Sequence, residues 1–178
     1  MSSNQNTEPL ELAELRCVIA ASGWLGLGNC KEARTELAAL TAERQNHPDV
    51  LESYWQICAQ EGVWPEALKI AQALVRHAPN LCTGWLHQAY ALRRVPGGGI
   101  QQAWDALLPA HEKFPREPTI SYNLSCYACQ MRDLDTARGW LKRALSSIRK
   151  RKIRNQFKLM ASTDPDLEPL WDEIRRMR

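Results

Sequence analysis

Long apolar segments and a strong net charge are both missing from this sequence of 178 residues. No apolar run approaches the roughly 20 residues that a helix needs to cross a bilayer, so we expect no helical membrane span. The formal net charge is +3, which is too small by itself to indicate a nucleic-acid-binding protein. Residues 1–8 are polar and lack the charged-then-apolar order of a secretory signal. We expect them to form a disordered tail.

The short motifs of common catalytic sites are missing as well. Gly97-Gly98-Gly99 is not followed by the Lys and Ser or Thr of a phosphate-binding loop. The glycines at positions 23, 26 and 28 have the wrong order for a dinucleotide site and follow a predicted helix. There is no HExxH motif and no serine nucleophile elbow. Because both glycine clusters suit turns between helices, we expect neither an enzyme nor a cofactor.

The cysteines do not indicate a disulfide framework. There are six, at positions 17, 30, 58, 82, 126 and 129. A chain that can form a large core and lacks a secretion signal favours reduced, buried thiols and a cytoplasmic location. Cys126 and Cys129 would share one face of a helix, where two thiols can bind zinc or exchange electrons. Zinc needs about four ligands and no second pair follows at a suitable spacing, so we expect two core side chains and no metal site.

The composition is nevertheless that of a folded protein with a repeat. Hydrophobic residues make up 44% of the chain and seven residues are tryptophan, which supplies ample apolar area for a core. Four alanines, at positions 33, 67, 103 and 137, recur at intervals of 34, 36 and 34 residues. Each precedes an apolar residue by four positions. A fixed period near 34 residues is typical of an array of helical repeats.

The segment from Pro48 to Asn80 illustrates one repeat. It opens with an apolar stripe of helical spacing, formed by Leu51, Tyr54, Trp55 and Cys58. Gly62 interrupts this stripe, and Pro65 suits the first turn of a new helix. A second stripe follows, formed by Ala67, Leu68, Ala71, Leu74 and Val75. The segment is therefore predicted to fold as helix, turn and helix, and the same order recurs around the other three alanines.

These repeats resemble the tetratricopeptide repeat (TPR), whose pattern places Trp, Leu-Gly and Tyr in a first helix, Ala and Phe in a second, and Pro at the end. One matching set is Trp85-x2-Gln88-Ala89-x2-Leu92, Ala103-x3-Leu107 and Pro115. Another is the segment Ser121–Ser125 with Ala137-x3-Leu141 behind it. Trp55 departs from the pattern, since a small residue is usual at its position.

The resemblance implies an all-α protein, a right-handed TPR α-solenoid of about four helix-turn-helix pairs. We expect the array to cover residues 9–147, in units of about 14–47, 48–81, 82–117 and 118–147. The turn at Pro96–Gly99 takes up the two extra residues of the middle interval, and Asp133 or Asp135 caps the last second helix. Residues 148–178 are predicted to form an extended last helix and a C-terminal cap, similar to the tails of bacterial TPR proteins of undefined role.

In the TPR family the first helix of each pair lines a concave groove that binds peptides. The resemblance therefore implies a partner groove built from residues one step beyond each core stripe. These are Glu52, Gln56, Gln60, Leu86, His87, Tyr90, Arg94, Tyr122, Asn123, Cys126 and Gln130. They offer amides for backbone hydrogen bonds, and Arg94 for a carboxylate or cation–π contact. The alternative for Tyr90 and Tyr122 is packing between adjacent repeats, and the sequence favours neither reading.

One subclass of the family uses Lys and Asn along this groove to hold the C-terminal carboxylates of chaperones. The corresponding positions here hold Glu52 and Gln56, Leu86 and Tyr90, and Tyr122 and Cys126. None of these side chains can form such a clamp. The sequence therefore disfavours a chaperone-binding role.

The strongest charge feature is a basic run formed by Arg149, Lys150, Arg151, Lys152 and Arg154. One interpretation is an electrostatic patch for nucleic acid or an anionic membrane. The other is a solvated helix end whose cations complement the helix macrodipole. We expect the second, because short basic runs are common at helix ends and this one holds no aromatic residue to stack on bases.

The sequence thus predicts a non-catalytic adaptor or scaffold that binds a peptide or protein partner in the TPR groove. The alternative is a scaffold that binds nucleic acid or an anionic membrane through the basic run at 149–154, although we do not expect a nucleic-acid partner. Self-association into a homodimer is a third hypothesis.

Overall fold

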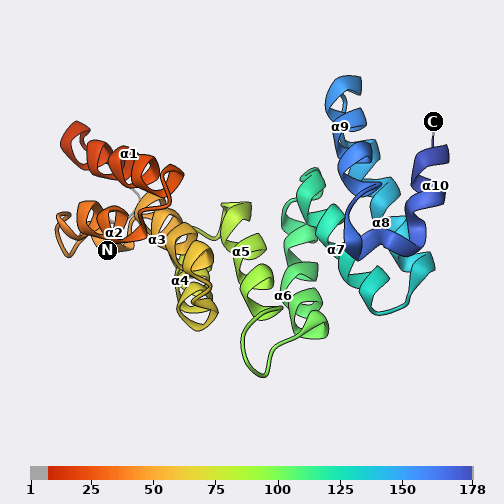
Figure 1. The fold of residues 1–178 in the computed structure, drawn as a ribbon, viewed down its shortest axis with the longest axis horizontal. Coiled ribbons are helices and arrows are strands. Elements are labelled where there is room, and N and C mark those ends of the chain that lie inside the picture. The colour runs from red at the N-terminus through yellow and green to blue at the C-terminus, as the bar shows by residue number, and fades with distance from the viewer. Residues whose placement is uncertain (1–7, 178) are drawn as a thin grey trace. The chain divides into compact units, whose positions relative to one another are not determined.

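The computed structural model describes residues 8–177, and within this range every regular element is a helix (Figure 1). The chain divides between Gly97 and Gly98 into two compact units, which we call unit 1 and unit 2. Both units are built from consecutive helices joined by short turns.

Local sequence signals set the helix ends of unit 1. Its elements are α1 (Leu12–Gly26), α2 (Cys30–Ala38), the short 3-10 helix η2 (Arg44–Asn46), α3 (Pro48–Glu61), α4 (Trp64–His77) and α5 (Cys82–Leu92). The Asn29 side chain caps α2 by accepting from the Glu32 amide at 3.1 Å. Gly62 caps the C-terminal end of α3, and its φ of 73° favours glycine. α1 packs on α2, and α4 packs on both α3 and α5.

Small, fully buried side chains let the helices of unit 1 approach closely. Ala33 and Ala67, two of the periodic alanines, are fully buried. α4 and α5 meet at Gly84, where an added Cβ would lie 3.0 Å from the Leu74 Cβ atom and 3.1 Å from the Val75 amide nitrogen. The alanine period of the sequence therefore marks the helix contacts of the core.

Unit 2 continues the same pattern and then departs from it. Its elements are α6 (Ile100–Lys113), α7 (Pro118–Gln130), α8 (Leu134–Ser147), α9 (Arg151–Ala161), the 3-10 helix η3 (Pro165–Leu170) and α10 (Trp171–Arg176). α7 packs on α6 and α8, and the alanines Ala103 and Ala137 are fully buried. Asp133 caps α8 by accepting from the Thr136 amide at 3.1 Å, which confirms one of the two predicted caps.

The end of unit 2 is not the single extended helix that the sequence suggested. α8 ends at Ser147, Ile148 has an extended backbone, and α9 begins at Arg151. After α9 the chain folds back, so that η3 packs against α7 and α8. Leu167, Leu170 and Ile174 are buried in this region. The segment therefore caps the last helix pair, as a repeat array requires.

The all-α fold of helix-turn-helix pairs with a C-terminal cap is thus confirmed. The third predicted pair, α5 and α6, is divided between the two units at the turn Pro96–Gly99. The four residue ranges given to the repeats stay a prediction. Residues 1–7 of the predicted tail lie outside the described residues, whereas Glu8 is exposed and its carbonyl oxygen accepts from Arg44 Nη1 at 3.4 Å.

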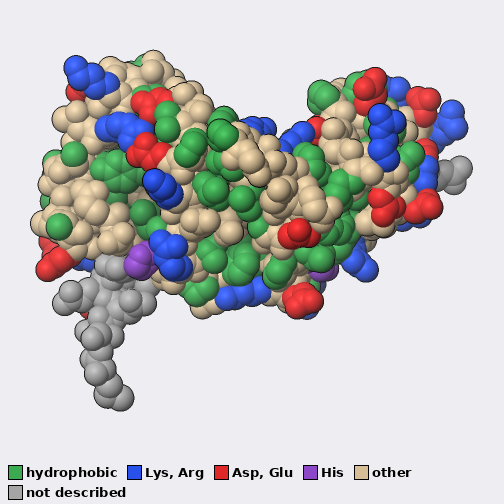
Figure 2. Space-filling model, turned by 90° about the horizontal axis from the view of Figure 1, so that it is seen from below, with side chains coloured by type: hydrophobic (Ala, Val, Ile, Leu, Met, Phe, Trp, Pro, Cys, Tyr) green, Lys and Arg blue, Asp and Glu red, His purple; other side chains and the backbone are tan. Residues whose placement is uncertain are grey.

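The molecular surface carries charges of both signs. On the face drawn in Figure 2, Lys and Arg side chains are interspersed with Asp and Glu, and apolar side chains reach the surface between them. This mixture agrees with the small net charge of +3. No helix within residues 8–177 combines the length and the apolar composition that crossing a membrane requires.

Candidate partner-binding surface

The predicted groove residues fall into two sets, one in each unit. The set in unit 1 comes from α3, α5 and the turn after α5, and the set in unit 2 comes from α7. Unit 1 holds Glu52, Gln56, Gln60, Leu86, His87, Tyr90 and Arg94, and unit 2 holds Tyr122, Asn123, Cys126 and Gln130. The two sets have different surroundings, so each is built up from its own contacts.

Three residues of α3 present a polar strip. Glu52, Gln56 and Gln60 are four residues apart and therefore lie on one side of the helix. Gln56 and Gln60 are exposed, and Glu52 is half-buried. Gln56 Nε2 donates to Glu52 Oε1 at 3.3 Å, and Gln60 Nε2 makes a long contact of 3.5 Å with the Leu25 carbonyl oxygen. Both amides keep free capacity for further hydrogen bonds because each can donate two and accept two.

Glu52 is committed to holding α5 against α3. Its Oε1 atom lies 2.7 Å from His87 Nε2. Burial alone would raise the pKa of the Glu52 carboxyl, but hydrogen bonds from His87, Gln56 and Thr83 and the charge of His87 outweigh it, so the pKa lies below its usual value. Glu52 and His87 therefore position the two helices.

Next to this contact lies the aromatic cluster, formed by the rings of four residues and the Arg94 guanidinium; the rings belong to Trp55, Trp64, His87 and Tyr90. Trp55 stacks on His87 with ring centres 3.6 Å apart and an interplanar angle of 9°. Tyr90 and Trp55 make an edge contact with ring centres 5.9 Å apart, and Tyr90 and Trp64 make a tilted contact at 5.7 Å. The sequence had marked Trp55 as a departure from the repeat pattern but gave no sign of its partner, and it did not single out Trp64.

Arg94 completes the aromatic cluster at its exposed side. Its guanidinium carbon lies 3.5 Å from the centre of the Tyr90 ring and 5.1 Å from that of Trp64. Arg94 Nη1 donates to the Tyr90 carbonyl oxygen at 3.0 Å, which fixes the plane of the guanidinium. Tyr90 keeps 39% of its surface exposed, while Leu86 is half-buried. The result is a rigid, partly exposed platform with one cation.

Two of the four predicted groove residues of α7 are instead covered by the chain itself, whereas Asn123 is half-buried and Gln130 is exposed. Tyr122 and Cys126 are buried. Tyr122 Oη donates to Asp164 Oδ2 at 2.7 Å, and Gln130 Nε2 donates to the Asp166 carbonyl oxygen at 3.1 Å. Burial, and next this hydrogen bond to Asp164, raise the pKa of the Tyr122 hydroxyl well above its usual value.

The remaining α7 side chain of this set is also bonded within unit 2. Asn123 is half-buried, and its Nδ2 atom donates to the Thr119 carbonyl oxygen at 2.8 Å. The Phe157 ring of α9 packs perpendicular to the Tyr122 ring, with ring centres 6.0 Å apart. A role for the α7 residues in partner binding stays a prediction.

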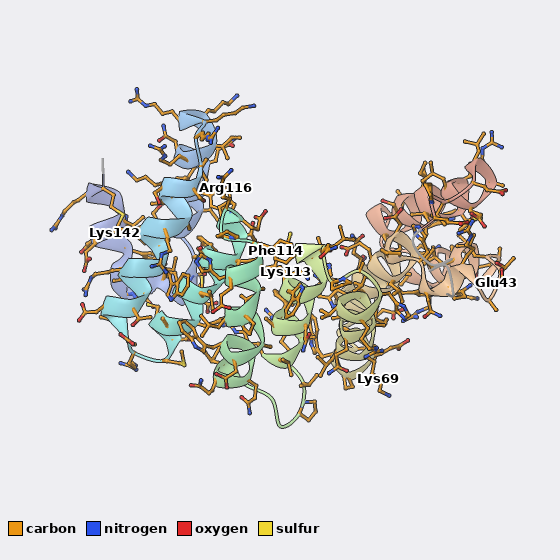
Figure 3. The ribbon with its side chains drawn as sticks, turned by 180° about the vertical axis from the view of Figure 1, so that it is seen from behind. Glu43, Lys69, Lys113, Phe114, Arg116 and Lys142 are labelled. Carbon is orange, nitrogen blue, oxygen red and sulfur yellow. The ribbon has the colours of Figure 1, made fainter. Side chains whose placement is uncertain are left out.

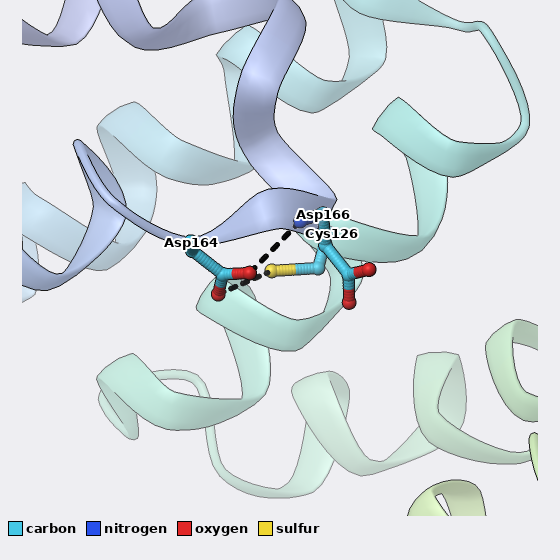
Figure 4. Close-up of side chains that lie close together, drawn as sticks. All are labelled: Cys126, Asp164 and Asp166. Carbon is cyan, nitrogen blue, oxygen red and sulfur yellow. Dashed lines mark hydrogen bonds between the residues drawn. The ribbon is translucent and has the colours of Figure 1, made fainter.

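Cys126, Asp164 and Asp166 bring a thiol and two carboxylates within 4.8 Å of one another (Figure 4). Asp164 Oδ1 caps η3 by accepting from the Asp166 amide at 2.9 Å, and Oδ2 accepts from Tyr122 and from the Cys126 thiol at 3.8 Å. The Asp164 carboxylate is therefore already used on both oxygens. Nearby, burial raises the pKa of the Cys129 thiol, which favours its neutral form.

The basic run occupies the junction between α8 and α9. Arg149 and Lys150 link the two helices, whereas Arg151 and Lys152 lie in the first turn of α9, which carries no acidic residue. Positive charge at the start of a helix is not stabilised by the macrodipole. The expectation of cations that stabilise a helix end therefore does not hold for Arg151 and Lys152. Arg154 is half-buried and donates through Nε and Nη2 to the Ile148 carbonyl oxygen at 3.2 and 2.7 Å.

A second ring cluster lies on the other helices of unit 2. Trp140 of α8 is met edge-on by Trp104 and His111 of α6, at ring-centre distances of 6.2 and 4.7 Å. The Arg143 guanidinium carbon lies 4.8 Å from the Trp140 ring centre. Burial, and next the charge of Arg143, lower the pKa of His111. No sequence motif indicates this group, because its members belong to two helices.

Comparison with known proteins bears on the fold. No protein-family model matches the sequence, and no curated protein does. Among solved structures, the chain is similar to a thermophilic TPR protein from Thermus thermophilus, with a TM-score of 0.66 and 18% sequence identity, over 93% of this chain and 100% of that one. Identity this low shows the fold and not a shared activity. Together with the four buried periodic alanines and the helix pairs, this structural similarity shows that the chain has the fold of the tetratricopeptide repeat proteins.

Proposed function

We propose that the protein is a non-catalytic scaffold that binds a peptide or protein partner, with its main contacts on α3 and α5 of unit 1. The observation that carries the proposal is the exposed polar strip of Gln56 and Gln60 in the same unit as Tyr90 and Arg94. Repeat arrays present such first-helix faces as binding surfaces. The fold of the solved TPR structure supports the same function class.

The side chains indicate what kind of peptide would fit. Gln56 and Gln60 can hydrogen-bond the backbone of an extended segment. Tyr90 offers a ring that loses little conformational entropy on binding, because its contacts with Trp55 and Trp64 already fix it. The Arg94 guanidinium stacks on the Tyr90 ring with donors left for a carboxylate. A partner segment with an acidic side chain beside an apolar one is the best match.

We propose that the α7 residues of the predicted groove support the fold of unit 2. Tyr122, Cys126 and Gln130 hold the C-terminal segment in place, so we propose that unit 2 contributes few contacts to the partner.

The proposal includes a cytoplasmic location. No disulfide joins the cysteines within residues 8–177, which is in keeping with a reducing compartment.

The alternative function, binding of nucleic acid or of an anionic membrane, rests on the exposed cations at the start of α9. Arg151 and Lys152 lie there without an acidic residue in the same turn. Their binding to RNA, DNA or anionic vesicles would fall steeply with salt. If neither nucleic acid nor vesicles bind at low ionic strength, this alternative is excluded.

Self-association is proposed through α1, which exposes an apolar stripe. Leu12, Leu15 and Ile19 lie on one side of the helix and are exposed. A second copy of the chain could bury this stripe in a symmetric contact. We expect Ile19→Glu to shift a dimer to monomer in sedimentation equilibrium, while Leu159→Glu, an equally exposed site in unit 2, leaves the mass unchanged. A monomeric wild-type chain at high concentration would exclude this contact.

The main proposal is tested by affinity capture from the native host with matched variants. Tyr90→Ala combined with Arg94→Gln removes the platform, and we expect the captured partner to be lost while the helical circular dichroism is unchanged. Gln130→Ala is the control in unit 2 and should capture the partner as the wild type does. Capture that survives the double substitution would show that the partner binds elsewhere.

A further inference from the structure

A basic hollow lies between α8, α9 and the end of α10 in unit 2. Its volume is about 430 Å³, and the residues lining it are Lys142, Leu145, Ser146, Arg154, Lys158 and Met177. This is within the size range of pockets that bind small organic ligands. Figure 3 labels Lys142 on α8. Of the predicted basic run only Arg154 reaches the hollow.

The two helices present matched pairs to this hollow. Lys142 and Ser146 are four residues apart on α8, and Arg154 and Lys158 are four residues apart on α9. Residues at this spacing share one side of a helix. Three cations thus converge from two helices, and none of the described residues that line the hollow is acidic. Concave sites lined by charges of one sign concentrate the opposite ion.

Neutral groups hold two of the three cations without cancelling their charge. Arg154 is fixed by its two hydrogen bonds to the Ile148 carbonyl oxygen. Lys158 Nζ donates to the Met177 carbonyl oxygen. Lys142 is exposed. The charge of Lys142 contributes to lowering the pKa of Glu173, after the larger effect of Arg138. The Glu173 carboxylate is paired with Arg138, from which it accepts two hydrogen bonds of 2.7 Å. The pair of Arg138 and Glu173 therefore leaves the hollow positively charged.

We propose that this hollow binds a phosphate group carried by a small organic molecule or by a lipid. An anion with several oxygens can accept from all three cations at once, which a single carboxylate cannot do as well. The volume exceeds that of one phosphate, and Leu145 and Met177 supply an apolar wall for the rest of the ligand. The site lies in unit 2 and is independent of the partner surface proposed for unit 1.

The first experiment titrates inorganic phosphate into the whole protein at constant ionic strength and follows the backbone amide signals by NMR. We expect saturable shifts centred on Lys142, Ser146, Arg154 and Lys158. Lys142→Gln should weaken the binding about tenfold, since it removes one charge-assisted hydrogen bond. Lys152→Gln makes the same charge change on the exposed side of α9 and should weaken it less than about twofold, because Lys152 does not line the hollow. A thermal melt checks that both variants stay folded.

Two results would overturn the proposal. One is the absence of saturable shifts at these residues, or equal shifts with acetate at the same ionic strength. The other is an equal loss of affinity in Lys152→Gln and Lys142→Gln, since that would report net charge and not a site. The source of the phosphate is then found by comparing glycerol 3-phosphate with phosphatidylcholine vesicles that contain phosphatidic acid. Binding of either that depends on Lys142 supports the site, and binding of neither contradicts it.

Discussion

Units 1 and 2 carry the same repeat register on their first helices, but only unit 1 exposes the middle position of that face. The register makes Gln56, Tyr90 and Cys126 equivalent positions of α3, α5 and α7. Gln56 and Tyr90 are exposed, whereas Cys126 is 3% exposed under the C-terminal segment. The repeat register therefore predicts which residues share a face, and the neighbouring chain decides whether that face can meet a partner.

The side chains at these positions suit their different surroundings. Unit 1 has amides and an arginine stacked on rings, which tolerate water on one side. Unit 2 has Tyr122, whose hydroxyl finds a carboxylate when its ring is buried, and the small apolar thiol of Cys126. Substitutions in the segment that covers α7, residues 164–170, should therefore act on the stability of unit 2. Substitutions on the exposed face of unit 1 should act on partner binding.

Weakening the packing of η3 over α7 should have the largest effect on stability. Leu167 is fully buried, and Leu167→Ala should lower the free energy of unfolding by about 2–5 kcal/mol, because it leaves a cavity under η3. Urea unfolding followed by tryptophan fluorescence measures this loss. Leu159→Ala removes the same side chain from a position that is 67% exposed and should change stability by no more than about 0.5 kcal/mol. Equal effects would mean that the segment is not packed as described.

The hydrogen bond between Tyr122 and Asp164 should be the next most important part of the cover. Tyr122→Phe deletes a hydrogen bond to a charged group and should cost about 1.5–3 kcal/mol of unfolding free energy. Because folding raises the pKa of Tyr122, the wild type should keep this contribution below pH 10.0, where an unperturbed tyrosine titrates, and lose it as the pH rises further. Urea midpoints measured in alkaline buffers should therefore fall more steeply in the wild type than in Tyr122→Phe.

In unit 1 the contact between Glu52 and His87 should matter for helix position more than for overall stability. Folding lowers the pKa of Glu52, so its contribution is present above pH 4.5, where an unperturbed glutamate titrates, and is lost as the pH falls through the folded pKa. Glu52→Gln should flatten the acid limb of the stability curve and weaken partner binding by loosening α5. Gln56→Ala removes only the weaker hydrogen bond to Glu52 and leaves the contact between Glu52 and His87 in place, so it should flatten the acid limb less than Glu52→Gln does.

The smallest expected effect concerns His111 in the second ring cluster. Folding lowers its pKa, so the neutral form is favoured and its contribution is lost as the pH falls below 6.5, where an unperturbed histidine titrates. We expect the thermal midpoint of unit 2 to fall slightly on mild acidification, and less so in His111→Gln. An identical pH dependence in both proteins would show that burial and the charge of Arg143 do not favour the neutral ring of His111.

Much of the fold could be predicted because its signals are local and periodic. The periodic alanines predicted the helix contacts. Asp133 could be predicted as a helix cap because its side chain accepts from an amide three residues further on and needs no distant partner. The cover over α7 could not be predicted in the same way. Its contacts join residues such as Tyr122 and Asp164, which are 42 positions apart and belong to no repeat.

Two further differences between the structure and the prediction from the sequence also have physical causes. No proline or glycine marks the break between Ser147 and Arg151, so the sequence suggested one continuous helix there. Trp55 stood out as too large for its repeat position, but its stacking partner His87 comes from the next repeat. A residue that violates a repeat pattern indicates a contact between repeats, without indicating which residue it meets.

The central claim, that α3 and α5 are open to a partner while α7 is covered by its own chain, can be tested by thiol labelling. The variant Gln56→Cys and the native Cys126 are labelled in the same molecule and read out separately by mass spectrometry, with and without the captured partner. We predict fast labelling at position 56 that the partner slows, and slow labelling of Cys126 in both conditions. Fast labelling of Cys126 in the isolated protein, or protection by the partner at Cys126 and not at position 56, would contradict the account.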